Sequence, residues 1–344
     1  MLSLRDRTRR RRSALLTRVL PAVVGIATTA VVSATLTGGG TSGAATYPNP
    51  GTVTGSTGIH DPSMVKGTDG VYYAFGTGSG IPMKTSTDRT SFASAGQALP
   101  NGATWSSAYH SDLKDIWAPD ISYHNGKYLL YYAVSSFGSN KSAIGVAGST
   151  TAKAGSWTDY GLVFATSSSN SYNAIDPNLV VDSSGKWWLT FGSWWTGIKQ
   201  IQIDPSTGKQ LSTNKTVYSV ASRTSTSLGI EAGFVFKHGS YYYLFTSWDI
   251  CCQGVNSTYN IRVGRSTSIN GTYKDKSGVA LTSGGGTLLL ASHGTIIGPG
   301  GQSILADTDH DLLVYHYYDG ADNGNPKLGI NWLLWDSSDW PYVG

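Results

Sequence analysis

The chain has 344 residues, a formal net charge of +4 and only 13% charged side chains. Residues 1–45 contain seven arginines and one aspartate, a net charge of +6, so residues 46–344 carry the remaining −2. The basic balance therefore belongs to the N-terminus, and no basic stripe remains that would indicate a nucleic acid partner.

The N-terminus has the pattern of an export signal. A basic start over residues 5–12 precedes a mostly apolar run over residues 15–36, and the small residues 43–45 suit a signal peptidase. The pair Arg11-Arg12 also resembles a twin-arginine signal. We predict a secretion signal at residues 1–45 and a secreted, extracellular protein without membrane contact after export. A retained membrane anchor is the alternative.

Residues 46–344 contain five copies of one pattern, in which an acidic or small residue precedes an apolar run, a tight turn and an aromatic-rich run. The copies begin at Asp61, Asp120, Asp176, Glu231 and Gly301. A long repeat built from strand pairs is typical of radial or stacked architectures.

The first four copies contain hairpin turns at Asp69-Gly70, Asn125-Gly126, Ser184-Gly185 and His238-Gly239. Asn-Gly and Asp-Gly favour turns that match the twist of paired strands. A third strand and often a fourth follow each pair, which describes a propeller blade. We therefore predict an all-β fold, a five-bladed β-propeller in a single domain over residues 46–344. A β-helix would need shorter repeats, and a sandwich would not need self-similarity.

The two cysteines, Cys251 and Cys252, are adjacent. Neighbouring Cα atoms lie ~3.8 Å apart, closer than the usual disulfide span of about 4.4–6.8 Å. Because export favours oxidation, a vicinal disulfide is one interpretation, and two partly buried thiols are the other. A metal site is not expected, because there is no second cysteine pair.

In a propeller blade the first strand lies nearest the axis, so Asp61, Asp120, Asp176 and Glu231 should surround the central cavity. Carboxylates that crowd one pocket acquire different pKa values. Hydrolysis of a glycosidic bond needs one protonated carboxyl and one ionised carboxylate. Two alternatives remain: Asp-Pro pairs often form turns, and an axial calcium site would also use carboxylates.

Aromatic side chains near these acids indicate a sugar ligand. Trp117 precedes Asp120, and Phe137, Trp194 and Trp195 follow strand pairs, where we expect loops to reach the cavity, although core packing would also explain each of them. His60 either contacts the substrate or stabilises a turn. The sequence has no nucleophile elbow, P-loop or H-E-x-x-H motif, and its seven histidines lack zinc-binding spacing.

Five short segments carry a family resemblance. They are His60-Asp61-Pro62, Trp117-Ala118-Pro119-Asp120, Asn173-Ala174-Ile175-Asp176-Pro177, Gly229-Ile230-Glu231-Ala232 and the closing run from His316 to Asp322. Together they resemble the arabinanases of glycoside hydrolase family 43, over nearly all of residues 46–344. The resemblance implies a five-bladed propeller glycoside hydrolase that cleaves internal α-1,5-L-arabinan linkages with inversion. We expect arabinan or an arabino-oligosaccharide as the partner, and a monomer.

The resemblance assigns a role to each matching residue. Asp61 corresponds to the general base that activates water, Glu231 to the general acid, and Asp176 to the carboxylate that holds the acid and tunes its pKa. Asp120 corresponds to an acid with a supporting role. The resemblance assigns arabinose contacts to His60, Trp117, Asp120, Phe137, Asn173, Ala174 and Ile175.

One segment departs from the family pattern. Many relatives carry Gly-Pro-Gly-His in the fifth repeat, and that histidine helps to hold an axial metal, usually calcium. Here the run is Gly298-Pro299-Gly300-Gly301. We expect no required cofactor. An axial calcium ion stays open with its ligands unassigned, and His293 or His316 would replace the missing histidine.

Two rival functions remain on the same fold. An exo-acting arabinanase or arabinofuranosidase differs by loops that close one end of the groove. A non-catalytic sugar-binding propeller would bind without turnover. The endo-acting enzyme is our prediction.

Overall fold

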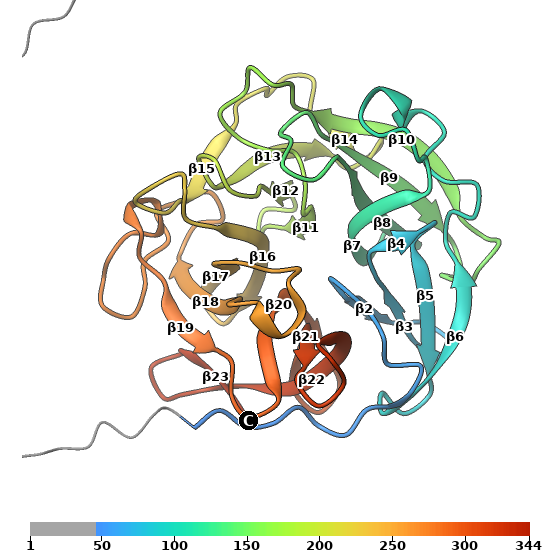
Figure 1. Cartoon of the computed structure of the whole chain (residues 1–344). Helices are drawn as coiled ribbons and strands as arrows, with labels where there is room; N and C mark the ends of the chain where they lie inside the picture. Colours follow the sequence, from blue (N-terminus) through green and yellow to red (C-terminus); the bar gives the residue numbers. More distant parts are fainter. Residues whose placement is uncertain (1–45) are drawn as a thin grey trace, which may run out of the picture. The chain divides into compact units, whose positions relative to one another are not determined.

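A computed structural model describes residues 46–344, so the secretion signal predicted for residues 1–45 lies outside the described residues. Residues 46–344 form five sheets arranged around one axis (Figure 1). This confirms the predicted all-β, five-bladed β-propeller. Within the described residues, no helix is long and apolar enough to cross a bilayer.

Each sheet is one blade, and the blades follow one another in chain order. Blade 1 contains β2 (Ser63–Lys66), β3 (Tyr72–Phe75), β5 (Pro82–Ser86), β6 (Ser91–Gln97) and the short β1 (Thr54–Gly55). Blade 2 contains β7 (Asp115–His124), β8 (Lys127–Val134), β9 (Ala143–Ser149), β10 (Thr158–Ala165) and the short β4 (Gly78–Ser79). Blade 3 contains β11 (Asn178–Val181), β12 (Trp187–Phe191), β13 (Ile198–Asp204), β14 (Lys209–Gln210) and β15 (Tyr218–Ala221).

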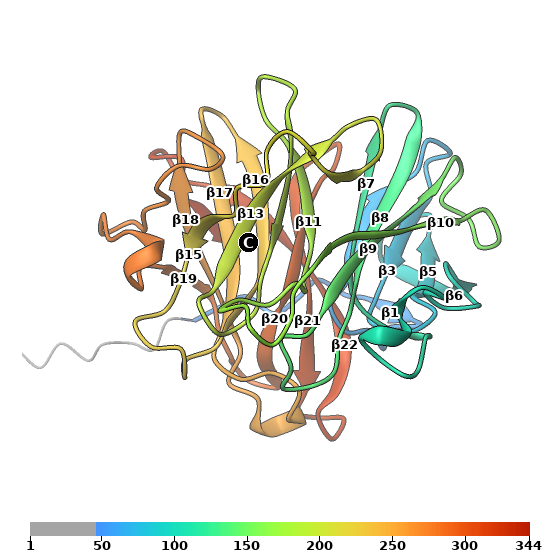
Figure 2. The same cartoon turned by 90° about the horizontal axis from the view of Figure 1, so that it is seen from above.

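Blade 4 contains β16 (Ile230–His238), β17 (Tyr241–Trp248), β18 (Asn260–Ser266) and β19 (Thr287–Leu290). Blade 5 contains β20 (Ile296–Ala306), β21 (Asp311–Asp319), β22 (Asn325–Trp335) and β23 (Pro341–Val343). Three short 3-10 helices are η1 (Ser106–Ala108), η2 (Gly254–Asn256) and η3 (Leu281–Ser283). In Figure 1 the innermost strands β2, β7, β11, β16 and β20 surround the axis, and in the perpendicular view of Figure 2 the strands run between the two faces of the ring.

The predicted turn chemistry explains why the first strands of a blade pair. Between β7 and β8, Asn125 and Gly126 have φ values of 52° and 79°, the left-handed conformation that a two-residue hairpin of matched twist requires. His124 therefore pairs directly with Lys127. The aromatic-rich second strand is covered on both faces, because residues 128–134 of β8 are all buried.

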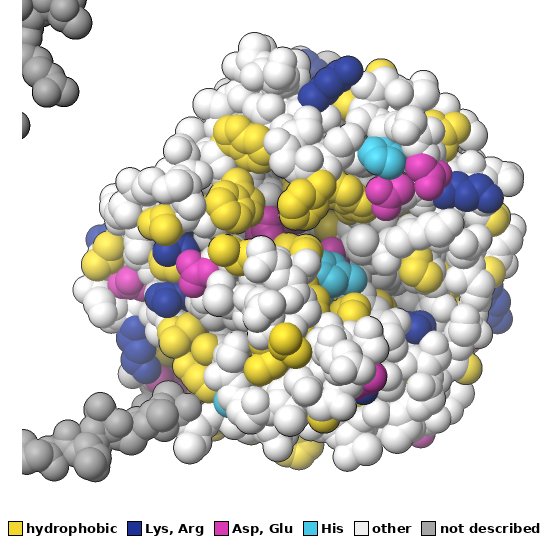
Figure 3. Space-filling view, in the orientation of Figure 1, with side chains coloured by type: hydrophobic (Ala, Val, Ile, Leu, Met, Phe, Trp, Pro, Cys, Tyr) yellow, Lys and Arg dark blue, Asp and Glu magenta, His cyan; other side chains and the backbone are white. Residues whose placement is uncertain are grey.

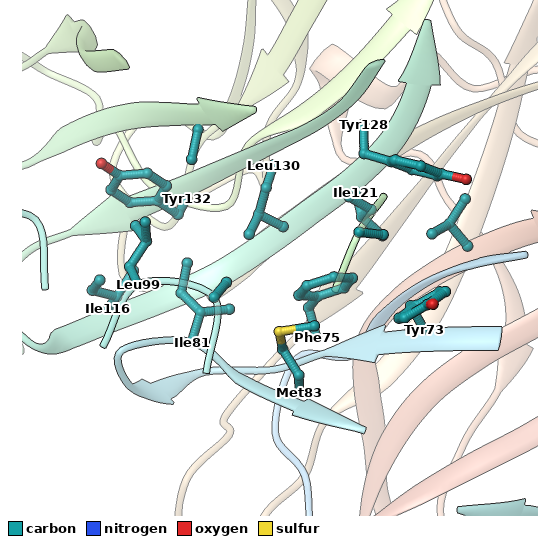
Figure 4. Packing of buried hydrophobic residues seen from close by; sticks show 14 of the residues in the cluster. Tyr73, Phe75, Ile81, Met83, Leu99, Ile116, Ile121, Tyr128, Leu130 and Tyr132 are labelled. Atoms are coloured by element: carbon teal, nitrogen blue, oxygen red, sulfur yellow. The ribbon is translucent and has the colours of Figure 1, made fainter. Parts of the chain in front are cut away.

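Apolar side chains fill the spaces between neighbouring blades. In one cluster Phe75 and Met83 of blade 1 pack with Ile121 and Leu130 of blade 2 (Figure 4). Five such clusters lie at the five junctions between adjacent blades. The apolar surface of each blade is therefore buried only when both neighbours are folded.

The segment that precedes blade 1 closes the ring. Its strand β1 pairs with β6 of blade 1. Gly51 N–H donates to the carbonyl of Ile330 in β22 at 2.9 Å, and Ile59 N–H donates to that of Pro326 at 3.3 Å. The main strands of each blade come from one continuous run of chain, so this segment joins the first blade to the last.

Candidate active site

In each blade, one residue of the innermost strand or two positions before it has a left-handed backbone near the axis. These residues are Asp61, Ala118, Asp176, Ala232 and Gly301, with φ values of 46°, 41°, 55°, 50° and 57°. All five line a small axial cavity of about 30 Å³. L residues rarely adopt this conformation, which persists only where the surrounding structure enforces it. Because it recurs in every blade, these five residues occupy equivalent positions.

This alignment corrects the repeat positions that the sequence predicted. Asp61 and Asp176 are equivalent, as predicted. Glu231 stands one residue before Ala232, however, and Asp120 stands two residues after Ala118. A shift of one residue along a strand changes the direction of the side chain, so Glu231 does not share the position of Asp61 and Asp176. Asp120, two residues from Ala118, still lines the axial cavity.

Asp120 is buried between blades 2 and 3. Its Oδ2 accepts a hydrogen bond from Leu179 N–H at 2.8 Å, and its Oδ1 accepts one from Asn178 Nδ2 at 3.2 Å. Asn178 repeats this arrangement one blade further on, where its Oδ1 accepts from Val235 N–H at 2.8 Å. Burial raises the pKa of Asp120 to about 7, against the effect of its two hydrogen bonds. Asp120 therefore joins neighbouring blades, and it lines the axial cavity.

A cleft of about 770 Å³ lies above this cavity, in the hollow at the centre of the face in Figure 3, where acidic, histidine and hydrophobic side chains meet. It is lined by eight of the ten predicted site residues: His60, Asp61, Trp117, Phe137, Asn173, Ile175, Asp176 and Glu231. The other two, Ala174 and Asp120, are buried outside this lining.

The cleft also contains residues that the sequence reasoning did not assign to the site. They include Thr77, Ser193, Cys251, Cys252 and Tyr259, whereas Trp194 and Trp195, which also line the cleft, were expected near the cavity. Cys251 and Cys252 form a disulfide, which is the first of the two interpretations made from their adjacency. The other residues come from loops and strands of several blades, and no local pattern marks them.

Asp61 is held as an ionised carboxylate. Its Oδ2 lies 2.8 Å from His60 Nδ1 and accepts a hydrogen bond from Thr77 Oγ1 at 2.7 Å. Its backbone N–H donates to His316 Nδ1 at 3.0 Å. Burial alone would raise the pKa of Asp61, but the charge and hydrogen bond of His60 outweigh it and hold the pKa well below its ordinary value. An ionised carboxylate in a cleft can accept a proton from water.

Glu231 has the opposite environment. Its side chain lies almost wholly out of solvent, at 8% exposure for the residue. Its two oxygens accept hydrogen bonds from Tyr259 Oη and from Ser193 Oγ, the second at 2.6 Å. Burial raises the pKa of Glu231, and the negative charge of Asp61 adds to the rise, against the effect of both hydrogen bonds. Glu231 is therefore the carboxyl suited to donate a proton.

Asp176 lies beside the acid. Its Oδ2 accepts a hydrogen bond from the backbone N–H of Ala232 at 2.9 Å, the residue that follows Glu231. Burial and the negative charges of Glu231 and Asp61 raise the pKa of Asp176 well above its ordinary value. The predicted spread is thus present: one carboxyl pKa is lowered and two are raised.

Aromatic surfaces flank these carboxyls. Phe137 is 85% exposed and Trp117 is fixed by a hydrogen bond from its Nε1 to Asp115 Oδ1 at 2.9 Å. Trp194 and Trp195 adopt left-handed backbone, with φ values of 52° and 41°. The exposed ring of Phe137 and the half-buried indoles offer flat apolar faces to the carbon skeleton of a sugar.

The residues beside Asp61 do not fit calcium. Among residues 46–344, His60, Asp61 and His316 form a group whose ligand atoms lie within 4.8 Å of one another. Two imidazoles and one carboxylate differ from the six to eight or so oxygen ligands that calcium takes. His293 does not line the cleft. A Cβ at Gly301 would lie 2.4 Å from Asp61 Oδ1, so a larger side chain there would displace the carboxylate.

The chain was compared with known protein families and sequences. Residues 50–341 match the family described as glycosyl hydrolases family 43. The chain is 47% identical over 288 residues to the extracellular endo-alpha-(1->5)-L-arabinanase 1 of Bacillus subtilis (strain 168), and the match covers 82% of this chain and 87% of that protein.

Solved structures share the same architecture. A GH43 endo-arabinanase from Bacillus licheniformis has a TM-score of 0.79 at 46% identity, over 85% of this chain and 99% of that chain. An exo-1,5-alpha-L-arabinanase from a bovine ruminal metagenomic library has a TM-score of 0.79 at 36% identity, over 83% and 97% of the two chains.

Proposed function

We propose that this chain, which belongs to the glycosyl hydrolases of family 43, is an endo-1,5-alpha-L-arabinanase that cleaves internal α-1,5 linkages of arabinan with inversion of configuration. The observation that carries the reaction is the opposite shift of two carboxyl pKa values in one cleft, lowered at Asp61 and raised at Glu231. The substrate follows from relatives of 46% and 47% identity that are named endo-arabinanases.

The reaction uses these two groups at once. Asp61 accepts a proton from a water molecule whose oxygen forms a bond to the anomeric carbon. Glu231 donates its proton to the glycosidic oxygen as the bond from that oxygen to the anomeric carbon breaks. Asp61 ends protonated and Glu231 ionised, and exchange with solvent restores both. Because the water attacks the face opposite the leaving oxygen, the configuration inverts.

Asp176 supports the acid through charge. Its carboxyl lies close enough to Glu231 for the two pKa values to depend on each other. Two neighbouring carboxyls resist losing both protons, because like charges at short distance raise each other's pKa. Asp176 therefore helps Glu231 to keep its proton until the leaving oxygen takes it.

Product sizes on linear arabinan test the proposed function. An endo-acting enzyme releases a ladder of oligosaccharides in the first minutes, whereas an exo-acting enzyme releases one short product from the start. The exo-acting alternative deserves this test because an exo-arabinanase shares the fold at 36% identity. Binding of arabinan without any product, in a sample where Glu231→Gln behaves like the unaltered chain, would instead support a sugar-binding propeller.

Proton NMR of the first products tests inversion. A fresh reducing end has the anomeric configuration opposite to that of the cleaved linkage if inversion holds, and it equilibrates afterwards. Retention of the original configuration would require a covalent intermediate and would contradict the roles of Asp61 and Glu231.

Export and oligomeric state complete the proposal. The N-terminal pattern and the extracellular name of the Bacillus subtilis relative support secretion. N-terminal sequencing of protein recovered from the culture medium should begin close to Thr46. Light scattering of that protein should give the mass of a monomer.

A further inference from the structure

A chain of hydrogen bonds leads from blade 5 to the carboxylate of Asp61. Tyr318, a buried residue of β21, places its Oη 2.8 Å from His60 Nε2. The other nitrogen of the same ring, Nδ1, lies 2.8 Å from Asp61 Oδ2. Tyr318 is 258 positions from His60 in sequence, so only ring closure brings the three groups together.

The positions of the protons in this series of hydrogen bonds follow from the charge of Asp61. Asp61 is ionised, so His60 Nδ1 carries the proton and donates it to Asp61 Oδ2. In the neutral ring, Nε2 then accepts the hydroxyl proton of Tyr318. In the imidazolium, Nε2 donates to the same oxygen. The contact between Tyr318 and His60 therefore persists in both protonation states.

The disulfide turn fixes the far end of the chain. The backbone N–H of Cys252 donates to Tyr318 Oη at 2.7 Å. Cys252 has a left-handed backbone, with φ of 65°, and its sulfur is bonded to Cys251. Its Sγ also lies 3.8 Å from His60 Nε2. The turn therefore contacts Tyr318 and His60 together.

The face of His60 is also held. Its ring stacks on that of His316, with centroids 3.7 Å apart and an angle of 26° between the planes. His60 thus has Asp61 at one nitrogen, Tyr318 at the other and His316 against its face. A ring with contacts on three sides has little freedom to rotate.

The orientation of Asp61 decides which oxygen meets the water. His60 and Thr77 both bind Oδ2. Among the described residues, Oδ1 has no hydrogen-bond donor; His316 Nδ1 lies 3.5 Å away, but it accepts the backbone N–H of Asp61, and burial lowers the pKa of His316. Because Oδ2 is anchored, Oδ1 is the oxygen that is free to accept a proton from water. Misplacement of a reacting group by about 1 Å can cost about 100-fold in rate.

We propose that Tyr318 is a positioning residue for the general base. It orients His60, His60 orients the Asp61 carboxylate, and the Cys251–Cys252 turn holds Tyr318 in place. This inference rests on the proposed hydrolase function.

The first experiment compares two tyrosines of the same strand. Tyr318→Phe removes the hydroxyl that binds His60. Tyr315→Phe is the matched control, because its buried hydroxyl donates to Asn331 Oδ1 at 2.7 Å and it does not line the cleft. On linear arabinan, Tyr318→Phe should lower kcat about 10-fold with KM within about twofold. Tyr315→Phe should keep both constants, with a comparable change in Tm.

The pH dependence of kcat/KM distinguishes a positioning role of Tyr318 from a purely structural one, because loss of stability alone would not shift the acid limb. Asp61 faces His60, His316 from β21, Asp176 from blade 3 and Glu231 from blade 4. Once Tyr318 no longer holds His60, the hydrogen bond to Asp61 weakens and the pKa of Asp61 rises. The acid limb of kcat/KM should therefore move to higher pH in Tyr318→Phe and stay in place in Tyr315→Phe.

The second experiment tests whether the disulfide turn acts through Tyr318. Replacement of Cys251 and Cys252 by alanine should lower kcat several-fold in the otherwise unaltered chain. The same replacement should add nothing in the Tyr318→Phe background, because both changes remove one interaction. Dithiothreitol reduces the protein disulfide to two cysteine thiols and is itself oxidised to a cyclic disulfide. It should reproduce the loss of kcat only in proteins that contain the two cysteines.

The results of these experiments distinguish failure of this inference from failure of the proposed function. If Tyr318→Phe keeps its kcat and its acid limb while the unaltered chain cleaves arabinan, this inference fails and the proposed function stands. Additive losses from the two sets of changes overturn the part played by the disulfide turn. If the unaltered chain cleaves no arabinan, the proposed function fails first.

Discussion

At the residue scale, three carboxyls in one cleft differ in protonation because their neighbours differ. Asp61 has a histidine on its own segment, and its pKa falls. Burial raises the pKa values of Glu231 and Asp176, and the negative charge of Asp61 adds to both rises. The residue type alone does not distinguish base from acid, since both are carboxyls. The difference arises from what surrounds each group.

Substitution of the two reacting carboxyls should separate these roles from folding. Asp61→Asn and Glu231→Gln should each lower kcat on linear arabinan by about 10²–10⁴-fold, because each removes one proton transfer. The amides keep the shape of the side chains, so circular dichroism should be unchanged. Asp120→Asn is the matched control: it alters a buried acid outside the cleft and should leave kcat within about twofold. An equal loss in all three variants would contradict the assignment.

Asp120 predicts a pH dependence of stability. Its pKa is raised from 3.8 to about 7 in the folded chain. Between these values the unfolded chain is ionised at this carboxyl while the folded chain keeps the proton. Stability from this group is therefore lost as pH rises from about 4 to about 7, and the loss is constant above that range.

Urea unfolding of the unaltered chain and of Asp120→Asn at several pH values measures this effect. Asparagine does not ionise, so the difference in unfolding free energy between the two proteins should change by up to about 4 kcal/mol across the window. Parallel curves for the two proteins would mean that Asp120 is ionised in the folded chain.

At the element scale, the fold depends on how blade 5 meets blade 1. The segment before blade 1 pairs with β6 and β22. A buried carboxylate of blade 5 forms a second connection to blade 1. The side chain of Asp307, with 0% exposure, follows β20 of blade 5. It binds Lys66 Nζ at 3.2 Å, Tyr72 Oη at 2.7 Å and Arg89 Nη1 at 2.6 Å. All three partners belong to blade 1.

Removal of this charge should weaken the closure. Asp307→Asn leaves two cations of blade 1 facing an uncharged, buried amide, and the free energy of unfolding should fall by about 3 kcal/mol. The control is Asp309→Asn, because Asp309 also binds Arg89 of blade 1 but its side chain is 44% exposed. The free energy of unfolding should change much less in Asp309→Asn, because solvent screens an exposed ion pair. Guanidinium titrations of the three proteins measure both values, and equal losses would mean that Asp307 contributes no more than a surface pair.

At the scale of the whole molecule, the ring makes the site. Asp61, Asp176 and Glu231 come from blades 1, 3 and 4. Each blade buries its apolar faces against two neighbours, through clusters at all five junctions. The site therefore exists only when the ring is closed.

This dependence predicts cooperative unfolding. Residues 46–344 should melt in one transition, with a calorimetric enthalpy close to the van't Hoff enthalpy, because no blade buries its core alone. Activity and near-UV circular dichroism should be lost at the same temperature. Two resolved transitions in calorimetry would show that part of the ring unfolds by itself.

Much of the fold and site was predictable from the sequence. Asn125-Gly126 and its counterparts give the hairpins because their conformation is a local property. The acids Asp61, Asp176 and Glu231 were predicted to meet, and all three line one cleft. Asp120 was predicted to surround the central cavity, and it lines the small axial cavity, but it lies outside the cleft, because the copies were aligned on their acidic residues. In the structure, the equivalent positions of the five copies are the residues with left-handed backbone. No single residue type marks these positions, since Ala118 and Ala232 adopt this conformation as well as aspartate.

What the sequence by itself determined is the number of blades, their turns and the residues that open each repeat, because these depend on contacts between near neighbours in the chain. The tertiary structure alone decided which hydrogen bonds reach those residues. Tyr259 meets Glu231 within blade 4, 28 positions along the chain, and Tyr318 of blade 5 meets His60 beside blade 1. Ring closure brings Tyr318 within bonding distance of His60, and no periodicity of the chain records a contact between its two ends.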